Sequence, residues 1–393
     1  MEPALLVVNP GSSSREYGLF RGKQQLVSAY YEKEDASDLS FSVSVTVRNK
    51  TSKSKIEQVD FTATLAHFLN VCRSYGIKLD EHLHAIGVRL VAPGRRFLQH
   101  TKLDDELYAY LQKNVAQAPL HLSAQLSEVD SLRAQLPATP IYMISDSAFH
   151  HSLLHEARNY AISTIDADKF DIYRYGYHGL SVSSAVNYLR DEMNLNYRHI
   201  IVCHLGSGAS VTALNDWRSC DTSMGYSPLE GLVMASRSGN IDLEAALEIK
   251  KQLRLSDEDL VEYLNKKSGL LGISGQSNDI RQLLELEQQE DYHASLALNM
   301  MLYRLRAYIG SYYASLGGLD ALVFTATVGE RSSVIRQRVC GPLSHLGIEI
   351  DHARNNETYS SNQIISTLGS KVAVHVVLAD EPGEIAKQTA KFL

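Results

Sequence analysis

The sequence lacks the features that mark several large classes of protein. Its 393 residues include four cysteines, which are far apart and show no paired metal spacing. We therefore expect reduced thiols rather than a zinc site or a disulfide framework. No run approaches the roughly 18–20 apolar residues that a membrane span needs, and the start, MEPALLVVNPGSSS, lacks the basic flank of a signal peptide. These absences predict a cytoplasmic protein with no membrane partner.

An excess of basic residues is also missing. The formal net charge is −7, which argues against a non-specific nucleic-acid binder, because such proteins usually carry a strong positive excess. The chain contains no GxxxxGK[ST] loop and no GxGxxG that opens a helix after a strand. These missing motifs weigh against P-loop kinases and dinucleotide dehydrogenases.

The chain does contain one short design that occurs twice, about half its length apart. An apolar run stops at a Gly-Ser turn and then resumes as a second apolar run. Since the length suits two domains, this repeat predicts two related α/β domains that face each other, although chance could also produce so short a match. The strand–turn–strand copies are Ala4–Asn9 with Arg15–Phe20, and Ile200–Cys203 with Val211–Leu214.

Strand and helix patterns alternate through the rest of the chain. This alternation favours parallel sheets with helical crossovers. The helix expected at His293–Leu316 is apolar on several faces, which suits either a core or interdomain helix or a dimer surface. The other predicted strands are Ala85–Val91, Ile141–Ile144 and Ala321–Thr325, and the other predicted helices are Asp105–Val115 and Asp242–Gln252.

The two Gly-Ser turns are candidate phosphate sites. Glycine lets the backbone approach a phosphate closely, and serine hydroxyls add hydrogen-bond donors. Either turn alone could equally be an ordinary polar hairpin. Two such turns across one cleft could hold opposite ends of a polyphosphate. The first turn lies within Asn9–Ser14, and the second is Gly206-Ser207-Gly208.

Two arginines, two histidines and an aspartate complete the candidates. Arg89 and Arg237 lie in apolar or small-residue surroundings, and a guanidinium group suits carboxylate or phosphate oxygens. His121 and His178 could donate to charge that grows in a transition state. Asp146 directly follows an apolar strand, where α/β sheets usually bind ligands. Each arginine alone could instead form a structural ion pair, and each histidine alone could instead be a structural residue whose hydrogen bonds are satisfied.

Together these segments resemble the acetate kinases, members of the sugar kinase/heat-shock/actin superfamily, over nearly the whole chain. The most specific stretch is DTSMGYSPLEGLVMASRSGNID. Further blocks that match the family in the right order are APLH, SDSAFH, RYGYHG, HLGSGAS and SGLLGISGQSNDIR. The resemblance implies two duplicated actin-like (ribonuclease H-like) domains around a central cleft. The expected boundaries are 1–149 plus 381–393 for the N-terminal domain, and 150–380 for a nucleotide-binding, dimerising second domain.

The resemblance also implies roles for individual residues. Asp146, His178, Arg237 and His121 would be catalytic, and Asn9 and Glu381 would hold Mg²⁺ (or Mn²⁺). The acid would contact Arg89, Val91, Leu120, Tyr177 and Pro228. ATP or ADP would contact Ser12, Ser14, His204, Gly206, Ser207, Gly208, Asp279, Ile280, Arg281, Thr327, Val328, Gly329 and Arg331.

Several residues depart from the family's pattern. Glu16 stands where a lysine is usual, and Arg15 cannot replace it because neighbouring strand residues point to opposite faces. Ala326-Thr327 replaces a glycine pair, Arg331 replaces an asparagine, and Tyr177 stands where phenylalanine is frequent. These changes leave open a shifted phosphoryl donor, such as another nucleotide or a shorter polyphosphate, as well as neutral drift.

The resemblance implies reversible, Mg²⁺-dependent phosphoryl transfer from ATP to acetate, by a homodimer. A propionate or other short-chain acyl kinase is the nearest alternative, because one methylene in an apolar pocket is worth only about 1–3 kcal/mol. A different class of function is a non-catalytic, nucleotide-binding regulatory relative. Retention of the charged set around Arg89 and Arg237 argues against that alternative.

Overall fold

The structure, a computed structural model, describes residues 2–11, 14–33, 41–47, 50–56, 63–77, 83–115, 119–357 and 361–393, without the side chains of residues 119–121. It divides into two compact units. Unit 1 comprises Met1–Ala148 and Asp380–Leu393, and unit 2 comprises Phe149–Ala379. Among the described residues, no helix has the length and apolar character needed to cross a bilayer.

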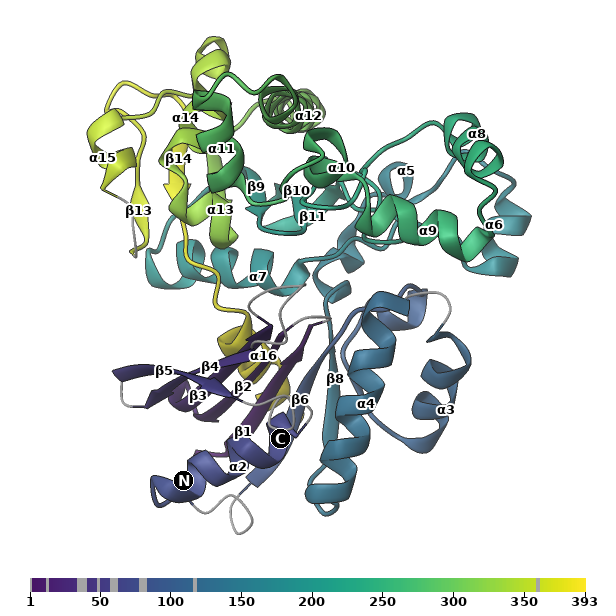
Figure 1. Cartoon of the computed structure of the whole chain (residues 1–393). Coiled ribbons are helices and arrows are strands. Elements are labelled where there is room, and N and C mark those ends of the chain that lie inside the picture. The colour runs from purple at the N-terminus through teal and green to yellow at the C-terminus, as the bar shows by residue number, and fades with distance from the viewer. Residues whose placement is uncertain are drawn as a thin grey trace. The chain divides into compact units, whose positions relative to one another are not determined.

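Unit 1 is built on an eight-stranded sheet in the order β5-β4-β3-β2-β1-β6-β8-β7 (Figure 1). The strands β1, β6 and β8 are parallel neighbours, as the alternating pattern predicts. The strands β2 to β5 pair antiparallel, because short turns can join only antiparallel neighbours. The strands are β1 (Ala4–Pro10), β2 (Ser14–Arg21), β3 (Gln24–Lys33), β4 (Phe41–Val47), β5 (Lys50–Ile56), β6 (Leu83–Leu90), β7 (Thr101–Lys102) and β8 (Ile141–Ser145).

Helices cover this sheet. Side chains of α2 and α4 share one core with alternate residues of β1 and β2, including Leu6, Val8 and Tyr17. The C-terminal helix α16 packs on β1 and β6. Gly87 permits that approach, because a Cβ there would lie 2.1 Å from Thr389 Oγ1. The helical segments are α2 (Thr64–Ser74), η1 (Arg95–Phe97), α3 (Asp105–Lys113), α4 (Pro119–Gln135) and α16 (Glu381–Ala390), with η3 (Ala148–Ser152) at the boundary.

Unit 2 repeats the central part of this design. Its sheet has the order β11-β10-β9-β12-β14-β13, in which β9, β12 and β14 are parallel and β9, β10 and β11 form an antiparallel meander. The central order matches β3-β2-β1-β6-β8 of unit 1. The duplicated fold inferred from the two Gly-Ser hairpins is therefore confirmed. The strands are β9 (His199–Leu205), β10 (Ala209–Asn215), β11 (Arg218–Thr222), β12 (Ala321–Thr325), β13 (Gln363–Ile364) and β14 (Ala373–Val376).

Within unit 2, α7 packs against β9 and β12, and α12 packs against β9 and β10 (Figure 1). Leu298, Leu305 and Ile309 of α12 are fully buried, so one face of this long helix belongs to the core of unit 2. The helical segments are α5 (His155–Arg158), α6 (Thr164–Phe170), α7 (Gly179–Asn187), η4 (Tyr188–Glu192), α8 (Leu243–Leu253), α9 (Asp257–Lys266), α10 (Gly269–Ser274), α11 (Ile280–Gln288), α12 (Tyr292–Leu316), α13 (Ala326–Arg331), α14 (Ser333–Cys340), η5 (Gly341–Leu346) and α15 (His352–Asn356).

Candidate functional site

In unit 1, the predicted site residues meet at one edge of the sheet. Asn9 lies near the end of β1, Arg89 near the end of β6, and Asp146 directly after β8. These strands are parallel neighbours, so their carboxyl ends lie side by side, where α/β sheets usually bind ligands. Glu381, the first residue of α16, joins them from the other end of the chain.

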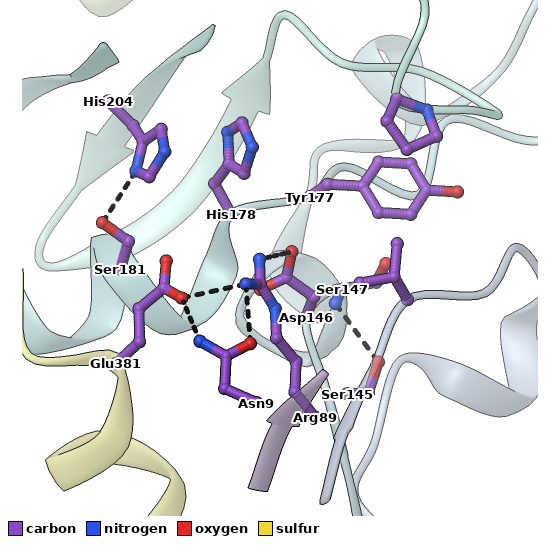
Figure 2. Close-up of polar contacts among 12 residues, drawn as sticks. Asn9, Arg89, Ser145, Asp146, Ser147, Tyr177, His178, Ser181, His204 and Glu381 are labelled. Atoms are coloured by element: carbon purple, nitrogen blue, oxygen red, sulfur yellow. Dashed lines mark hydrogen bonds and ion pairs between the residues drawn. The ribbon is translucent and has the colours of Figure 1, made fainter. Parts of the chain in front are cut away.

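Arg89 lies at the centre of this group (Figure 2). Its Nη2 donates to Asp146 Oδ2 at 2.9 Å, and its Nη1 donates to Glu381 Oε2 at 2.9 Å and to Asn9 Oδ1 at 3.2 Å. Asn9 Nδ2 also donates to Glu381 Oε2, at 3.2 Å. The buried Nε of Arg89 has no hydrogen-bond partner within the described part of the chain. One guanidinium N–H thus remains for a ligand.

The electrostatics of this cluster are dominated by burial and by carboxylates. Burial lowers the pKa of Arg89, but the charges of Asp146, Glu381 and Glu16 raise it by more. The net shift of the pKa is upward, so the guanidinium stays charged. Burial raises the pKa of Glu381, although Arg89 opposes that shift. Three carboxyl groups surround one guanidinium, so the cluster carries an excess of negative charge when all three are ionised. A divalent cation would offset that excess.

Glu16 belongs to the same cluster. It is the cross-strand partner of Asn9 in the β1–β2 pair, and burial, followed by the charge of Glu381, raises its pKa to about 7. Arg15 points to the other face, where its Nε lies 3.4 Å from Glu128 Oε2. The prediction that Arg15 and Glu16 point to opposite faces of the sheet is therefore confirmed.

The first Gly-Ser turn and the acyl-pocket residues of unit 1 are described only in part. Gly11 N donates to Ser14 O at 2.8 Å, which closes the turn. Val91 is buried, and its N–H donates to Gln125 Oε1 at 3.3 Å. The predicted Ser12, and the side chains of Leu120 and His121, lie outside the described part of the chain.

In unit 2, the second Gly-Ser turn joins β9 to β10, and Gly206 N donates to Gly208 O at 2.9 Å. Two histidines lie beside it. The rings of His178 and His204 are stacked, with 3.9 Å between their centroids. His204 Nδ1 lies 2.8 Å from Ser181 Oγ (Figure 2).

Gly208 is the point at which His178 and Arg237 converge. A Cβ at Gly208 would lie 3.1 Å from His178 Nε2 and 3.4 Å from Arg237 Nη1. Arg237 Nη1 also donates to Pro228 O at 3.2 Å. His178 precedes α7 with a left-handed backbone at φ +59°, which directs its ring to the turn at a conformational cost. The structure thus places a histidine edge and a guanidinium against a backbone turn suited to phosphate.

A cavity of about 490 Å³ adjoins this turn, within the usual range for small-molecule sites. Gly206 and Ser207 line one end, and Met301 and Leu305 of α12 supply an apolar wall. Met301 and Leu305 are not among the contacts predicted from the sequence, because a helix that is apolar on several faces does not reveal which side chains face a ligand. The predicted nucleotide contacts that line the cavity are Gly206, Ser207, Asp279, Ile280, Arg281, Thr327, Val328 and Arg331.

Of the nucleotide contacts predicted within unit 2, three do not line this cavity. Gly208 and His204 lie at the turn instead, and Gly329 is buried in α13 against Phe324. Asp279 caps α11 and pairs with Arg281, whose Nη2 lies 2.6 Å from Asp279 Oδ2.

Ala326 adopts a conformation unusual for alanine. Its φ is +64°, a left-handed value that costs an L-residue roughly 1–2 kcal/mol. A Cβ at Gly206 would lie 3.8 Å from Ala326 Cβ, so this strained residue adjoins the second Gly-Ser turn. Glycine would adopt the same backbone without strain.

A polar cluster that no sequence motif predicts holds the loop before Arg237. Arg174 Nη2 lies 2.6 Å from Glu230 Oε1, and Arg174 Nη1 donates to Thr222 O at 3.1 Å. Tyr160 donates to the other oxygen of Glu230. The partners are far apart in the chain, which is why no local motif connects them.

The chain is similar to known proteins over nearly its whole length. The model of the Acetokinase family matches residues 4–387. A relative named "Acetate kinase" from Dictyoglomus thermophilum is 38% identical over 99% of both chains. The crystal structure of acetate kinase from Porphyromonas gingivalis aligns with a TM-score of 0.85 at 32% identity, and a propionate kinase from Francisella tularensis with 0.87 at 31% identity; both cover 99% of each chain.

Proposed function

The chain belongs to the Acetokinase family, and on that premise we propose that it transfers a phosphoryl group reversibly between ATP and acetate, giving acetyl phosphate and ADP. The observation that carries this proposal is the convergence of His178 and Arg237 on Gly208, beside a nucleoside-sized cavity. This arrangement supports a role in binding and stabilising a phosphoryl group in transit rather than in abstracting a proton.

The chemistry needs no general base. An acetate oxygen, already deprotonated at neutral pH, attacks the terminal phosphorus of ATP. The bond to the bridging oxygen breaks, and its electron pair leaves with ADP. Since the attack brings two anions together, the residues must position them and offset their charge. Arg237 and the His178 edge are suited to the phosphoryl oxygens, and the unpaired Nε–H of Arg89 is suited to the incoming acid.

We further propose a resident Mg²⁺ (or Mn²⁺) held by Glu381 and Asn9. Mg²⁺ usually takes one or two protein oxygens and completes its shell with water and phosphate, and one carboxylate beside one amide suits that pattern. When bound, the ion would neutralise charge on the phosphate chain. The described residues contain no group of three or more His, Cys, Asp or Glu side chains able to form a protein-only metal site.

One observation favours a variant of this function. Ala326 and Thr327 place Cβ atoms beside the cavity and the turn, and Ala326 does so under backbone strain. A donor other than ATP, such as another nucleotide or pyrophosphate, is therefore a second candidate. The volume of about 490 Å³ favours a nucleotide over pyrophosphate.

The assembly and location follow as proposals. Leu243 and Leu247 of α8 and Val261 of α9 are exposed at 70%, 49% and 47%, which supports a homodimer through unit 2. All four cysteines are buried free thiols, as is usual in the reducing cytoplasm. Light scattering would test the dimer.

A hydroxamate assay for the acyl phosphate tests the function. The wild type is measured with ATP, GTP and pyrophosphate against acetate, propionate and butyrate, with Arg237→Ala as the comparison. We expect the best turnover with ATP and acetate, and a loss of about 100-fold or more in the variant. Equal signal from the two proteins would contradict the proposal, and a preference for GTP or pyrophosphate would select the second candidate.

A further inference from the structure

The loop that carries Pro228 is held by side chains from three other segments. The Tyr177 hydroxyl donates to the Tyr226 carbonyl at 2.7 Å, and the Tyr160 hydroxyl accepts from the Tyr226 N–H at 2.8 Å. Two residues later, the Pro228 carbonyl accepts from Arg237 Nη1 at 3.2 Å. Both backbone polar groups of Tyr226 are therefore fixed by tyrosine hydroxyls, and the loop connects them directly to Arg237.

The two tyrosines are themselves rigidly placed. Tyr177 is 1% exposed, and its own carbonyl lies 3.0 Å from Nε2 of the buried His150. Tyr160 donates to Glu230, which pairs with Arg174. A loop held by such buried partners has little freedom to move away from a ligand.

We propose that the Tyr177 hydroxyl is a positioning group: through the Tyr226 carbonyl it fixes Pro228 and Arg237, and so limits the length of the acid that is phosphorylated. This inference rests on the proposed function and on the expected contact of Tyr177 and Pro228 with the acid. The hydroxyl itself donates to the loop backbone. It therefore acts on the acid indirectly.

The physical reason lies in how an apolar pocket selects its ligand. An extra methylene is rejected only if the wall that it meets does not yield, because the intrinsic preference for one methylene is small. Phenylalanine at position 177 would keep the ring but leave the Tyr226 carbonyl without this donor. The loop could then shift outward, which enlarges the pocket and at the same time displaces the carbonyl that holds Arg237.

The test compares Tyr177→Phe with Tyr175→Phe. Tyr175 belongs to the same segment, but its hydroxyl donates to Asp171 O, so its removal leaves the Pro228 loop untouched. For each protein, kcat and KM are measured with acetate, propionate and butyrate at saturating donor. The ratio of kcat/KM for butyrate to that for acetate is independent of the folded fraction.

We expect Tyr177→Phe to raise this ratio at least about fivefold and to lower kcat with acetate, because Arg237 loses its fixed partner. Tyr175→Phe should leave both values within about twofold of wild type. Tyr160→Phe, which releases the other side of Tyr226, should move the ratio in the same direction as Tyr177→Phe.

If the wild type is active and Tyr177→Phe has the same butyrate-to-acetate ratio as the wild type, this inference alone is overturned. An equal shift in Tyr175→Phe would also overturn it, because the effect would then be a general loosening. A wild type that forms no acyl phosphate from any acid would overturn the proposed function and this inference together. If Tyr177→Phe fails to fold, Tyr160→Phe decides: an unchanged ratio in that variant overturns the inference.

Discussion

The imidazole rings of His178 and His204 lie stacked, with 3.9 Å between their centroids and 22° between their planes. A serine fixes each ring through Nδ1: Ser210 lies 3.0 Å from His178, and Ser181 lies 2.8 Å from His204. The orientation of both rings is thus set by β10 and α7 before any ligand binds. Preorganisation of this kind is what electrostatic stabilisation of a transition state requires.

Substituting Gly208 tests whether that orientation matters. In Gly208→Ala, the new Cβ would lie 3.1 Å from His178 Nε2 and 3.4 Å from Arg237 Nη1, so the His178 ring must move by a few tenths of an ångström, while Arg237 comes into van der Waals contact. We expect kcat to fall about 10- to 100-fold, because misplaced catalytic groups lose transition-state contacts. Steady-state kinetics with acetate and ATP would measure the loss.

Gly341→Ala provides the matched control. A Cβ at Gly341 meets no heavy atom within 4 Å, and its backbone is helical at φ −51°, so alanine fits there. Activity should stay within about twofold of wild type. If the two variants lose activity equally, crowding of His178 and Arg237 is not the cause.

Much of the fold could be predicted from local patterns. The strand Ala321–Thr325 was predicted with its observed bounds, because a buried parallel strand is apolar throughout. The Gly-Ser hairpins β1–β2 and β9–β10 followed from apolar runs on either side of a tight turn. These signals lie within a few residues of each other, so no tertiary knowledge is needed.

The rest of the site depends on contacts between distant segments. Arg89 and Glu381 are 292 residues apart in the chain, and no spacing rule predicts that they share a hydrogen bond. The left-handed backbone of Ala326 was equally unpredictable, because alanine rarely adopts it and the strain is imposed by the surrounding structure. The hydrogen bonds that join Tyr177 and Tyr160 to Tyr226 also connect segments distant in the chain, so no local pattern predicts them.

Glu16→Gln tests the charge beside the first Gly-Ser turn. At pH 8 the Glu16 carboxyl, whose pKa is about 7, is mostly ionised and repels an anionic donor. Glutamine keeps the shape and removes the charge, so we expect kcat/KM for ATP to rise about fivefold, equivalent to roughly 1 kcal/mol of relieved repulsion. Glu32→Gln on β3 is the control, because Glu32 is an exposed partner of Lys53. A fall in kcat/KM for Glu16→Gln would show that the carboxylate instead assists catalysis.

Ala326→Gly tests the strain in the turn at the start of α13. Because φ is +64° at Ala326, glycine should raise the free energy of unfolding by up to about 1 kcal/mol, after its greater unfolded entropy is counted. Ala307→Gly, at an exposed position within α12, should lower it by about 1 kcal/mol. Urea denaturation of both variants would give the two values. The same sign in both would mean that Ala326 carries no such strain.

His375 makes stability depend on pH. It is 5% exposed on β14, and its Nε2 lies 3.0 Å from the Tyr197 hydroxyl; burial lowers its pKa from 6.5 to about 4. Between these two pH values His375 binds a proton in the unfolded chain but stays neutral in the folded protein. The stabilisation present above pH 6.5 is therefore lost as pH falls to 4, by up to roughly 3 kcal/mol. Urea denaturation at several pH values should show this slope reduced in His375→Gln and retained in His345→Gln, which alters an exposed histidine. An unchanged slope in His375→Gln would mean that other groups bind the proton.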